Sequence, residues 1–194
     1  PIIWVTGDTH GDWIHRVNMD SFPEQREMSK DDYVIILGDF GIWRDSPQQR
    51  WYLNWLEEKH FTTLFIDGNH ENYDILDSYP VEEWHGGKVH FIKPSIIHLM
   101  RGQVFDIDGK KIFSFGGASS HDIQGGILEP DDPEFEKSYA LLSRGCLPFR
   151  INHWSWWKQE LPSDEEMEEG RQNLEKHNYE VDFIVTHCCS VSTQ

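Results

Sequence analysis

Residues 61–70, FTTLFIDGNH, decide the fold of this chain. Their apolar and β-branched start is typical of a strand buried on both faces, and the polar pair Asn69 and His70 follows after a turn. The same design recurs in residues 2–8 (IIWVTGD), 32–39 (DYVIILGD) and 181–187 (VDFIVTH). Buried strands that end in polar side chains predict ligand-binding residues at the carboxyl edge of a sheet.

Helical patterns lie between these strands. Ser46 before Pro47 predicts the start of a helix, with apolar residues at helical spacing after it. A second helix is predicted to start at Asp132 and to close at Gly145. Residues 163–177 predict a third helix that lies mostly on the surface, because few of its positions are apolar.

The middle of the chain has a different pattern. Residues 95–117 (SIIHLMRGQVFDIDGKKIFSFGG) predict antiparallel strands with a hairpin turn at Asp108 and Gly109. Parallel units and a hairpin section in one chain indicate an α/β or α+β fold with one or two mixed sheets. Because the sequence contains no internal repeat, low-complexity tract or linker, residues 1–194 are expected to form a single domain.

The charge balance restricts the class of partner. The chain has 17 Lys and Arg against 34 Asp and Glu, which gives a formal net charge of −17. Such a surface repels polyanions, so neither a long nucleic acid nor a membrane surface is expected as a partner. A small phosphate substrate remains compatible, because bound metal cations outweigh nearby carboxylates within a single site.

The cysteines and the apolar stretches predict a cytoplasmic location. The chain has three cysteines, two of them adjacent at Cys188 and Cys189, which is a poor framework for disulfides. No apolar stretch approaches the length that spans a membrane.

The side chains at the four strand ends have the donor atoms of a metal site. They are carboxylates, imidazoles and one amide, listed in full as Asp8, His10, Asp39, Asn69, His70 and His187. This mixture suits Mn, Fe, Zn, Co or Ni and lacks the thiolate cluster of a structural zinc site. The Asp-x-His spacing places Asp8 and His10 on one side of an extended segment. Asp39 has two carboxylate oxygens and is the natural bridge between two ions.

Each of these signals has a plainer explanation when taken alone. A Gly-Asp pair after a strand is more often a turn with a helix cap, and a single histidine at a strand end is more often structural. The combination of four such ends, in order, favours a site over those explanations.

In this order, Asp-x-His, Gly-Asp, Gly-Asn-His-Glu and a later Thr-His resemble the motifs of the calcineurin-like metallophosphoesterases. The resemblance runs from residue 2 to residue 189. It implies a four-layer αββα sandwich of two mixed sheets flanked by helices. It also implies hydrolysis of a phosphate mono- or diester by a hydroxide bound to two divalent metal ions.

The resemblance also assigns roles to individual residues. It places Asp8 and His10 on the first metal, Asp39 between both metals, and Asn69 and His187 on the second. His70 would bind no metal and would act as the catalytic residue near the phosphate and the leaving oxygen. Glu71 would be structural.

Two departures from the family pattern affect these expectations. The family's Gly-His-x-His motif, with one histidine for each metal, is absent, so we expect a C-terminally incomplete domain without its last strands. The Asp and Arg of the protein-phosphatase branch are replaced by Ile42 and Trp43, which argues against a Ser/Thr protein phosphatase. Arg44 is a candidate substrate-binding residue, with an ordinary surface arginine as the alternative.

Two further segments leave alternatives open. Residues 146–163 (CLPFRINHWSWWKQELPS) contain three tryptophans in four residues beside Arg150 and His153. They form a lip over the substrate, a subunit contact in a homo-oligomer, or plain packing. Residues 116–122 (GGASSHD) bring backbone donors or His121 near the cleft, or form a plain turn. The functional alternative to an enzyme is a non-catalytic binding or scaffolding protein that retains part of the site.

Overall fold

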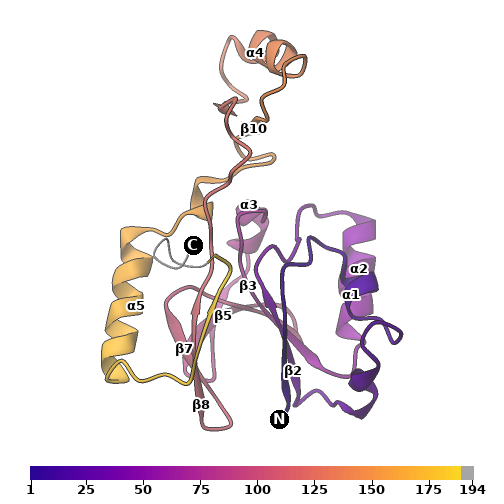
Figure 1. The fold of residues 1–194 in the computed structure, drawn as a ribbon, viewed down its shortest axis with the longest axis vertical. Coiled ribbons are helices and arrows are strands. Elements are labelled where there is room, and N and C mark those ends of the chain that lie inside the picture. The colour runs from indigo at the N-terminus through magenta and orange to yellow at the C-terminus, as the bar shows by residue number, and fades with distance from the viewer. Residues whose placement is uncertain (189–194) are drawn as a thin grey trace.

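The computed structural model describes residues 1–188 and contains two main sheets (Figure 1). The larger sheet has the strand order β1-β2-β3-β6-β5-β4. Its strands are β1 (Ile3–Thr6), β2 (Tyr33–Leu37), β3 (Thr62–Ile66), β4 (Val81–Trp84), β5 (Gly87–Lys93) and β6 (Ile96–Leu99). The neighbours β1, β2, β3 and β6 are parallel, whereas β5 is antiparallel to β6 and to β4. The parallel run brings the ends of β1, β2 and β3 to one edge.

The smaller sheet has the order β11-β8-β7. It consists of β7 (Gln103–Ile107), β8 (Lys110–Phe115) and β11 (Phe183–Thr186). The turn at Asp108 and Gly109 joins β7 to β8 in an antiparallel hairpin, and β11 is parallel to β8. The expected hairpin is therefore confirmed, but β6 does not join it: residues 96–99 pair with β3 and β5 in the larger sheet.

The layers follow from where the apolar side chains pack. Between the sheets, Ile35 and Leu64 of the larger sheet share a buried cluster with Phe105, Ile112 and Val185 of the smaller one. On the outer face of the larger sheet, a second cluster joins its strands to the helices α1 (Trp13–Arg16) and α2 (Pro47–Glu57). The helix α5 (Asp164–Lys176) covers the outer face of the smaller sheet (Figure 1). The αββα sandwich of two mixed sheets is thus confirmed.

The predicted helix starts are confirmed in two of three cases. The Ser46 side chain accepts a hydrogen bond from the backbone N–H of Gln49 at the start of α2. Ser163 and Glu166 form a capping box at the start of α5, whose only buried residue is Gly170. The helix α4 (Phe135–Leu142) begins later than the predicted Asp132, without a side-chain cap.

One segment stands away from the sandwich. We call residues 121–157 the excursion; it contains β9 (Ile127–Leu128), α4 and β10 (Arg150–Ile151) and rises beyond the edge where the strand-end motifs lie (Figure 1). The strands β9 and β10 pair in parallel. The 3₁₀ helix η2 (Lys158–Glu160) returns the chain to the body.

The remaining short helices are η1 (Pro23–Glu27) and α3 (Tyr73–Leu76). Across residues 1–188, no helix is both long enough and apolar enough to cross a membrane. The prediction of a buried strand is wrong for β1 and β11, which lie at the edges of their sheets and leave Val5 54 % and Ile184 66 % exposed.

Candidate metal centre

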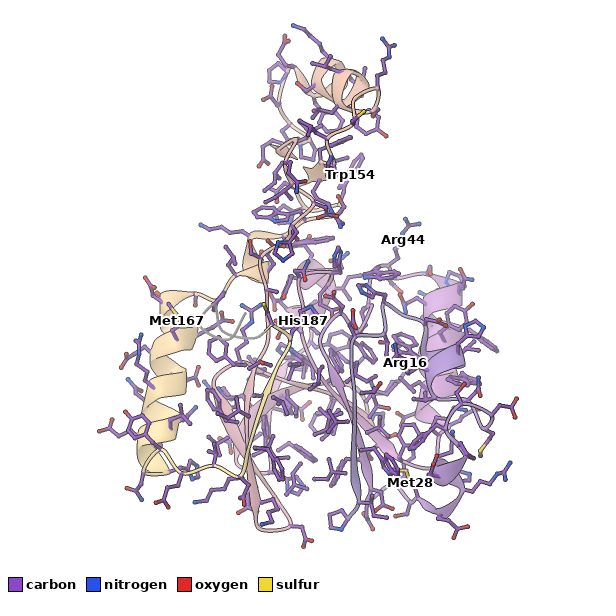
Figure 2. The ribbon with its side chains drawn as sticks, in the orientation of Figure 1. Arg16, Met28, Arg44, Trp154, Met167 and His187 are labelled. Atoms are coloured by element: carbon purple, nitrogen blue, oxygen red, sulfur yellow. The ribbon has the colours of Figure 1, made fainter. Side chains whose placement is uncertain are left out.

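Four of the predicted ligands meet where the two sheets come together. Asp8 and His10 follow β1, and Asp39 follows β2. His187 follows β11 of the other sheet, and its Nδ1 lies 2.8 Å from the carbonyl oxygen of Leu37 at the end of β2. Figure 2 shows His187 on the same side of the body as Arg44, facing the excursion that carries Trp154.

The Asp39 carboxylate occupies the middle of this group. Its Oδ2 lies 3.6 Å from Nε2 of His10 and 3.4 Å from Nε2 of His187. Nε2 of His10 in turn lies 2.9 Å from Oδ2 of Asp8. The ligand atoms of Asp8, His10 and Asp39 all lie within 4.8 Å of one another, which is close enough for a shared cation. The position of Asp39 between two imidazoles suits a carboxylate that bridges two ions.

The backbone around these side chains is unusual. His10 and Asp39 have positive φ angles of 49° and 41°, a conformation that few residues other than glycine adopt. A Cβ at Gly38 would lie 2.2 Å from Nδ1 of His187, and one at Gly68 would lie 2.0 Å from Oδ1 of Asp39. Strained backbone and glycine-dependent close approach mark a site whose geometry is tightly imposed.

The charges in the group are strongly coupled. Burial alone would raise the pKa of Asp39, but hydrogen bonds from His187 and from the backbone N–H of His70 outweigh it and hold this pKa below its usual value. Burial would lower the pKa of His187, yet the bonds to Asp39 and to the Leu37 carbonyl raise this pKa to about 9. A proton and a metal ion compete for the same Nε2 atom of His187.

The donor chemistry fits divalent metal ions. When Nδ1 of His187 donates its hydrogen to the Leu37 carbonyl, the lone pair of Nε2 faces Asp39. A ring nitrogen fixed on a backbone carbonyl is the usual way in which proteins orient a histidine toward a metal. Carboxylates and imidazoles without thiolates match first-row divalent ions.

Asn69 lies beside the group, and Ser120 holds its side-chain amide by a hydrogen bond. Its Nδ2 donates to Oγ of Ser120 at 3.2 Å, and the Ser120 hydroxyl donates to Oε2 of buried Glu160 at 2.6 Å. The amide nitrogen is therefore used, and the amide oxygen is the atom left to bind a cation. Within residues 1–188, the Asn69 side chain makes no hydrogen bond with the other four predicted ligands.

His70 lies beside these residues and is held by a pair of charged side chains from the excursion. The His70 ring packs edge to face against His10 with 5.4 Å between centroids. Its Nδ1 lies 3.3 Å from Nη2 of Arg150, and Arg150 is ion-paired with Asp122. Burial lowers the pKa of His70; the Asp39 carboxylate opposes this change and the Arg150 guanidinium adds to it.

The positions that differ from the protein-phosphatase pattern have structural tasks here. Ile42 is buried in the core at 2 % exposure. Nε1 of Trp43 donates to the backbone carbonyl of His70 at 2.8 Å. Glu71 is buried and accepts backbone hydrogen bonds from Phe40 and Gly41, so its expected structural task is observed.

A pocket of about 460 Å³ opens beside His70. Its lining comes from the loops after β1, β2 and β3, from α2 and from the excursion. The lining includes Arg44 and Arg150, together with the excursion residues Trp154, Ser155 and Trp157. The Trp-rich segment thus takes part in a lip over the pocket, and Trp157 also donates a hydrogen bond to Asp74 in the body.

A second charged cluster lies buried beneath the loop that carries Asn69 and His70. Oδ2 of Asp67 accepts from Nε and Nη2 of Arg101 at 2.9 and 2.6 Å, and Oδ1 lies 3.0 Å from Nε2 of His98. The Tyr73 hydroxyl donates to Asp67 and lies 2.5 Å from the carbonyl oxygen of Gly68. This cluster fixes the backbone from which Asn69 and His70 project.

Sequence patterns did not identify Arg150, Asp122, Ser120 or the buried cluster as parts of the site. Arg150 stood out only through its tryptophan neighbours, and it reaches His70 across 80 positions of sequence. Arg101 lies 34 positions from Asp67 and carries no motif. The one sequence signal for Arg101 is a charged residue in the short connection between two largely apolar runs, residues 96–100 and 103–107.

The chain has a clear match among protein families. The family model of the calcineurin-like phosphoesterases matches residues 2–189, a span that includes all four strand-end motifs. No curated protein and no solved structure gives a significant match to the chain.

Proposed function

Because the chain belongs to the calcineurin-like phosphoesterases, we propose that it hydrolyses a small phosphate mono- or diester with two divalent metal ions. The family as a whole comprises metal-dependent phosphoester hydrolases. The observation that supports the proposal for this chain is the Asp39 carboxylate, placed between Nε2 of His10 and Nε2 of His187 beside a pocket.

In this proposal Asp8 and His10 hold one ion, Asn69 and His187 hold the other, and Asp39 is shared. Bound divalent ions supply positive charge that activates water and neutralises the phosphoryl oxygens. Manganese is the first metal to test, and Fe, Zn, Co and Ni are compatible with the same donors.

His70 would donate a hydrogen bond from Nε2 to the departing oxygen and so stabilise the negative charge that develops there. An arginine has hydrogen-bond donors and no acceptor, so Nδ1 of His70 must accept from Arg150 and Nε2 carries the ring hydrogen. Burial keeps the ring neutral, because it lowers the pKa of His70. The ion pair with Asp122 fixes Arg150, which makes Arg150 a positioning residue for His70.

The test combines metal content with turnover. Protein stripped of metal and then loaded with Mn²⁺ is assayed with p-nitrophenyl phosphate and with bis-p-nitrophenyl phosphate, and metal per chain is measured by elemental analysis. His70→Asn should keep its metal and lose about 10²- to 10⁴-fold in turnover of esters that need a proton donor. Asp39→Asn should lose both metal and turnover.

His85→Asn is the matched control, because His85 is an exposed histidine in the turn between β4 and β5, outside the cluster and the pocket. It should change neither metal content nor turnover. If His70→Asn loses metal but keeps its turnover, the role assigned to His70 is wrong. Metal-loaded protein without activity toward any ester would favour the non-catalytic binding alternative.

A further inference from the structure

The pocket beside His70 has a charge unlike that of the rest of the surface. The chain as a whole carries twice as many acidic as basic residues. Among the residues that line the pocket, only Glu71 is acidic, and its carboxylate is buried against backbone N–H groups. The lining also carries two arginines, Arg44 and Arg150. The pocket therefore suits an anion despite the net negative charge of the chain.

The walls of the pocket are aromatic and come from separate segments. Trp43 follows β2, Tyr52 belongs to α2, and Trp154 and Trp157 belong to the excursion. Trp43 is anchored by its hydrogen bond to the His70 backbone, and Trp157 by its hydrogen bond to Asp74. Trp154 is 66 % exposed although it is large and apolar. An exposed tryptophan at the mouth of a pocket offers a ring face to a ligand.

One charged group of the pocket, Arg150, lies beside the candidate metal centre. Arg150 contacts His70, which follows the predicted ligand Asn69 directly. Arg44 has no hydrogen bond or ion pair with the described residues and is exposed at the pocket. The amides of Gln48 and Gln49 also line the pocket and can bond to polar ring edges. Phosphate and ring would thus bind side by side.

We propose that this pocket takes a planar aromatic group attached to the phosphate, so that the preferred substrates are nucleotides or other phosphoesters of flat ring systems. This substrate class rests on the proposed function, because it uses the same site. A volume of about 460 Å³ lies within the range of small-molecule pockets, roughly 300–1,000 Å³. Aromatic side chains bind bases through their faces, largely without regard to base identity.

The first experiment compares esters that differ only in the ring. Mn²⁺-loaded protein is assayed with AMP and with ribose 5-phosphate, which share the same leaving oxygen. We expect kcat/KM to be about 10- to 100-fold higher for AMP, as stacking on aromatic side chains predicts. Benzyl phosphate and cyclohexylmethyl phosphate form a second pair; a preference there as well shows that any flat ring is accepted.

Binding of products separates this proposal from the proposed hydrolysis. Isothermal titration with adenosine and with ribose requires no cleavage and no phosphate. Adenosine should bind at least about 10-fold more tightly than ribose. If adenosine binds in this way while no ester is hydrolysed, the pocket is supported and the hydrolase proposal fails.

Variants at Trp154 test the ring face directly. Trp154→Leu keeps an apolar side chain without a flat ring. It should reduce the preference for AMP, measured as kcat/KM for AMP divided by kcat/KM for ribose 5-phosphate, by about 5- to 20-fold. Trp154→Phe keeps a ring and should retain most of the ratio. Tyr179→Ala is the control, because Tyr179 is a comparably exposed aromatic residue, at 65 %, outside the pocket. Equal kcat/KM for the two esters, or a ratio unchanged in Trp154→Leu, would overturn the proposal.

Discussion

Two clusters of the same three residue types lie on opposite sides of the loop that carries Asn69 and His70. The buried cluster consists of Asp67, Arg101 and His98, with Tyr73 beside it. The half-buried cluster consists of Asp122, Arg150 and His70. In the buried cluster the carboxylate of Asp67 contacts both other residues, whereas in the half-buried cluster the guanidinium of Arg150 does.

The difference in burial separates the tasks of the two clusters. The side chains of Asp67 and Arg101 are 2 % and 3 % exposed, so each charge depends on the other. The side chains of Asp122 and Arg150 are 42 % and 19 % exposed, so water stabilises both charges in part. A buried pair is costly to break, while a partly solvated pair contributes little to folding and remains available to act on a neighbour. We infer that the buried cluster supports the loop, and that the half-buried cluster adjusts the chemistry of His70.

The largest effect is expected from Arg101→Met. This change leaves the Asp67 carboxylate buried without its main partner. It also removes the hydrogen bonds that Arg101 donates to Glu166 and to the carbonyl oxygen of Gln159. We expect a loss of about 3–5 kcal/mol in the free energy of unfolding. Urea unfolding followed by tryptophan fluorescence measures it.

Arg150→Met is the matched control, because it removes the arginine of the half-buried cluster. Its cost should stay below about 1 kcal/mol. Equal costs for the two variants would show that burial does not distinguish the clusters. The double change Asp67→Asn with Arg101→Met should recover part of the loss, because no unpaired charge then remains.

The second prediction concerns turnover in Arg150→Met. If Arg150 orients His70, kcat for an alkyl phosphate should fall about 10- to 100-fold, because the departing alkoxide depends on the hydrogen bond from Nε2 of His70. For p-nitrophenyl phosphate, whose leaving group needs no proton, kcat should change less than about threefold. Steady-state kinetics over a series of leaving groups decides between these outcomes.

A uniform loss of kcat across that series would contradict a positioning role and would assign Arg150 to the phosphate itself. Asp122→Asn provides a second variant, because it loosens Arg150 without removing it. Its effect should have the same direction and a smaller size. Nitrogen NMR of labelled histidines adds an independent readout, since the tautomer with hydrogen on Nε2 should lose its preference in Arg150→Met.

The contrast between the clusters also explains what sequence reasoning recovers. Asp8, Asp39 and His187 lie within two residues of the ends of strands, so the pattern of apolar runs was sufficient to predict that they lie in one region. The sandwich itself followed from the same runs and from the hairpin at Asp108. These signals are local, because each ligand lies within a few residues of the strand that positions it.

The partners of those residues are not local. Arg150 reaches His70 only because the excursion folds back over the pocket, and no spacing rule predicts that path. Likewise, β6 was predicted as part of an antiparallel section, but it pairs in parallel with the buried strand β3. Long-range pairings of this kind depend on the packing of the whole chain, which a periodic pattern does not contain.

The third prediction uses pH to separate the clusters. Burial would raise the pKa of Asp67, but Arg101 and His98 outweigh it and lower this pKa well below 3.8. The ionised Asp67 therefore stabilises the fold above pH 3.8, and this contribution is lost as the pH falls from there through the lowered pKa of the folded state. Without Arg101, burial favours the protonated carboxyl, so the penalty of Arg101→Met should shrink by about 1–2 kcal/mol between pH 7 and pH 4.

Unfolding measured at both pH values tests this expectation, with Arg150→Met as the comparison. The pKa of Asp122 is also lowered, first by its hydrogen bond with Arg150, but its carboxylate is partly solvated and can ionise without the arginine. Arg150→Met should therefore lower the free energy of unfolding by nearly the same small amount at pH 7 and at pH 4. A penalty of Arg101→Met that stays constant would show that Asp67 remains ionised without its partner.

The smallest effect is expected from Arg44→Met, and it sharpens the comparison by adding an arginine that belongs to neither cluster. Arg44 lines the same pocket as Arg150 but is exposed and has no ion pair with the described residues. A solvated, unanchored charge contributes at most about 1 kcal/mol to binding, so KM should rise no more than about fivefold while kcat stays constant. Steady-state kinetics with AMP measures both constants. A fall in kcat as large as that of Arg150→Met would mean that Arg44 acts on the reacting phosphate. The ion pair of Arg150 with Asp122 would then not explain the difference between the two arginines.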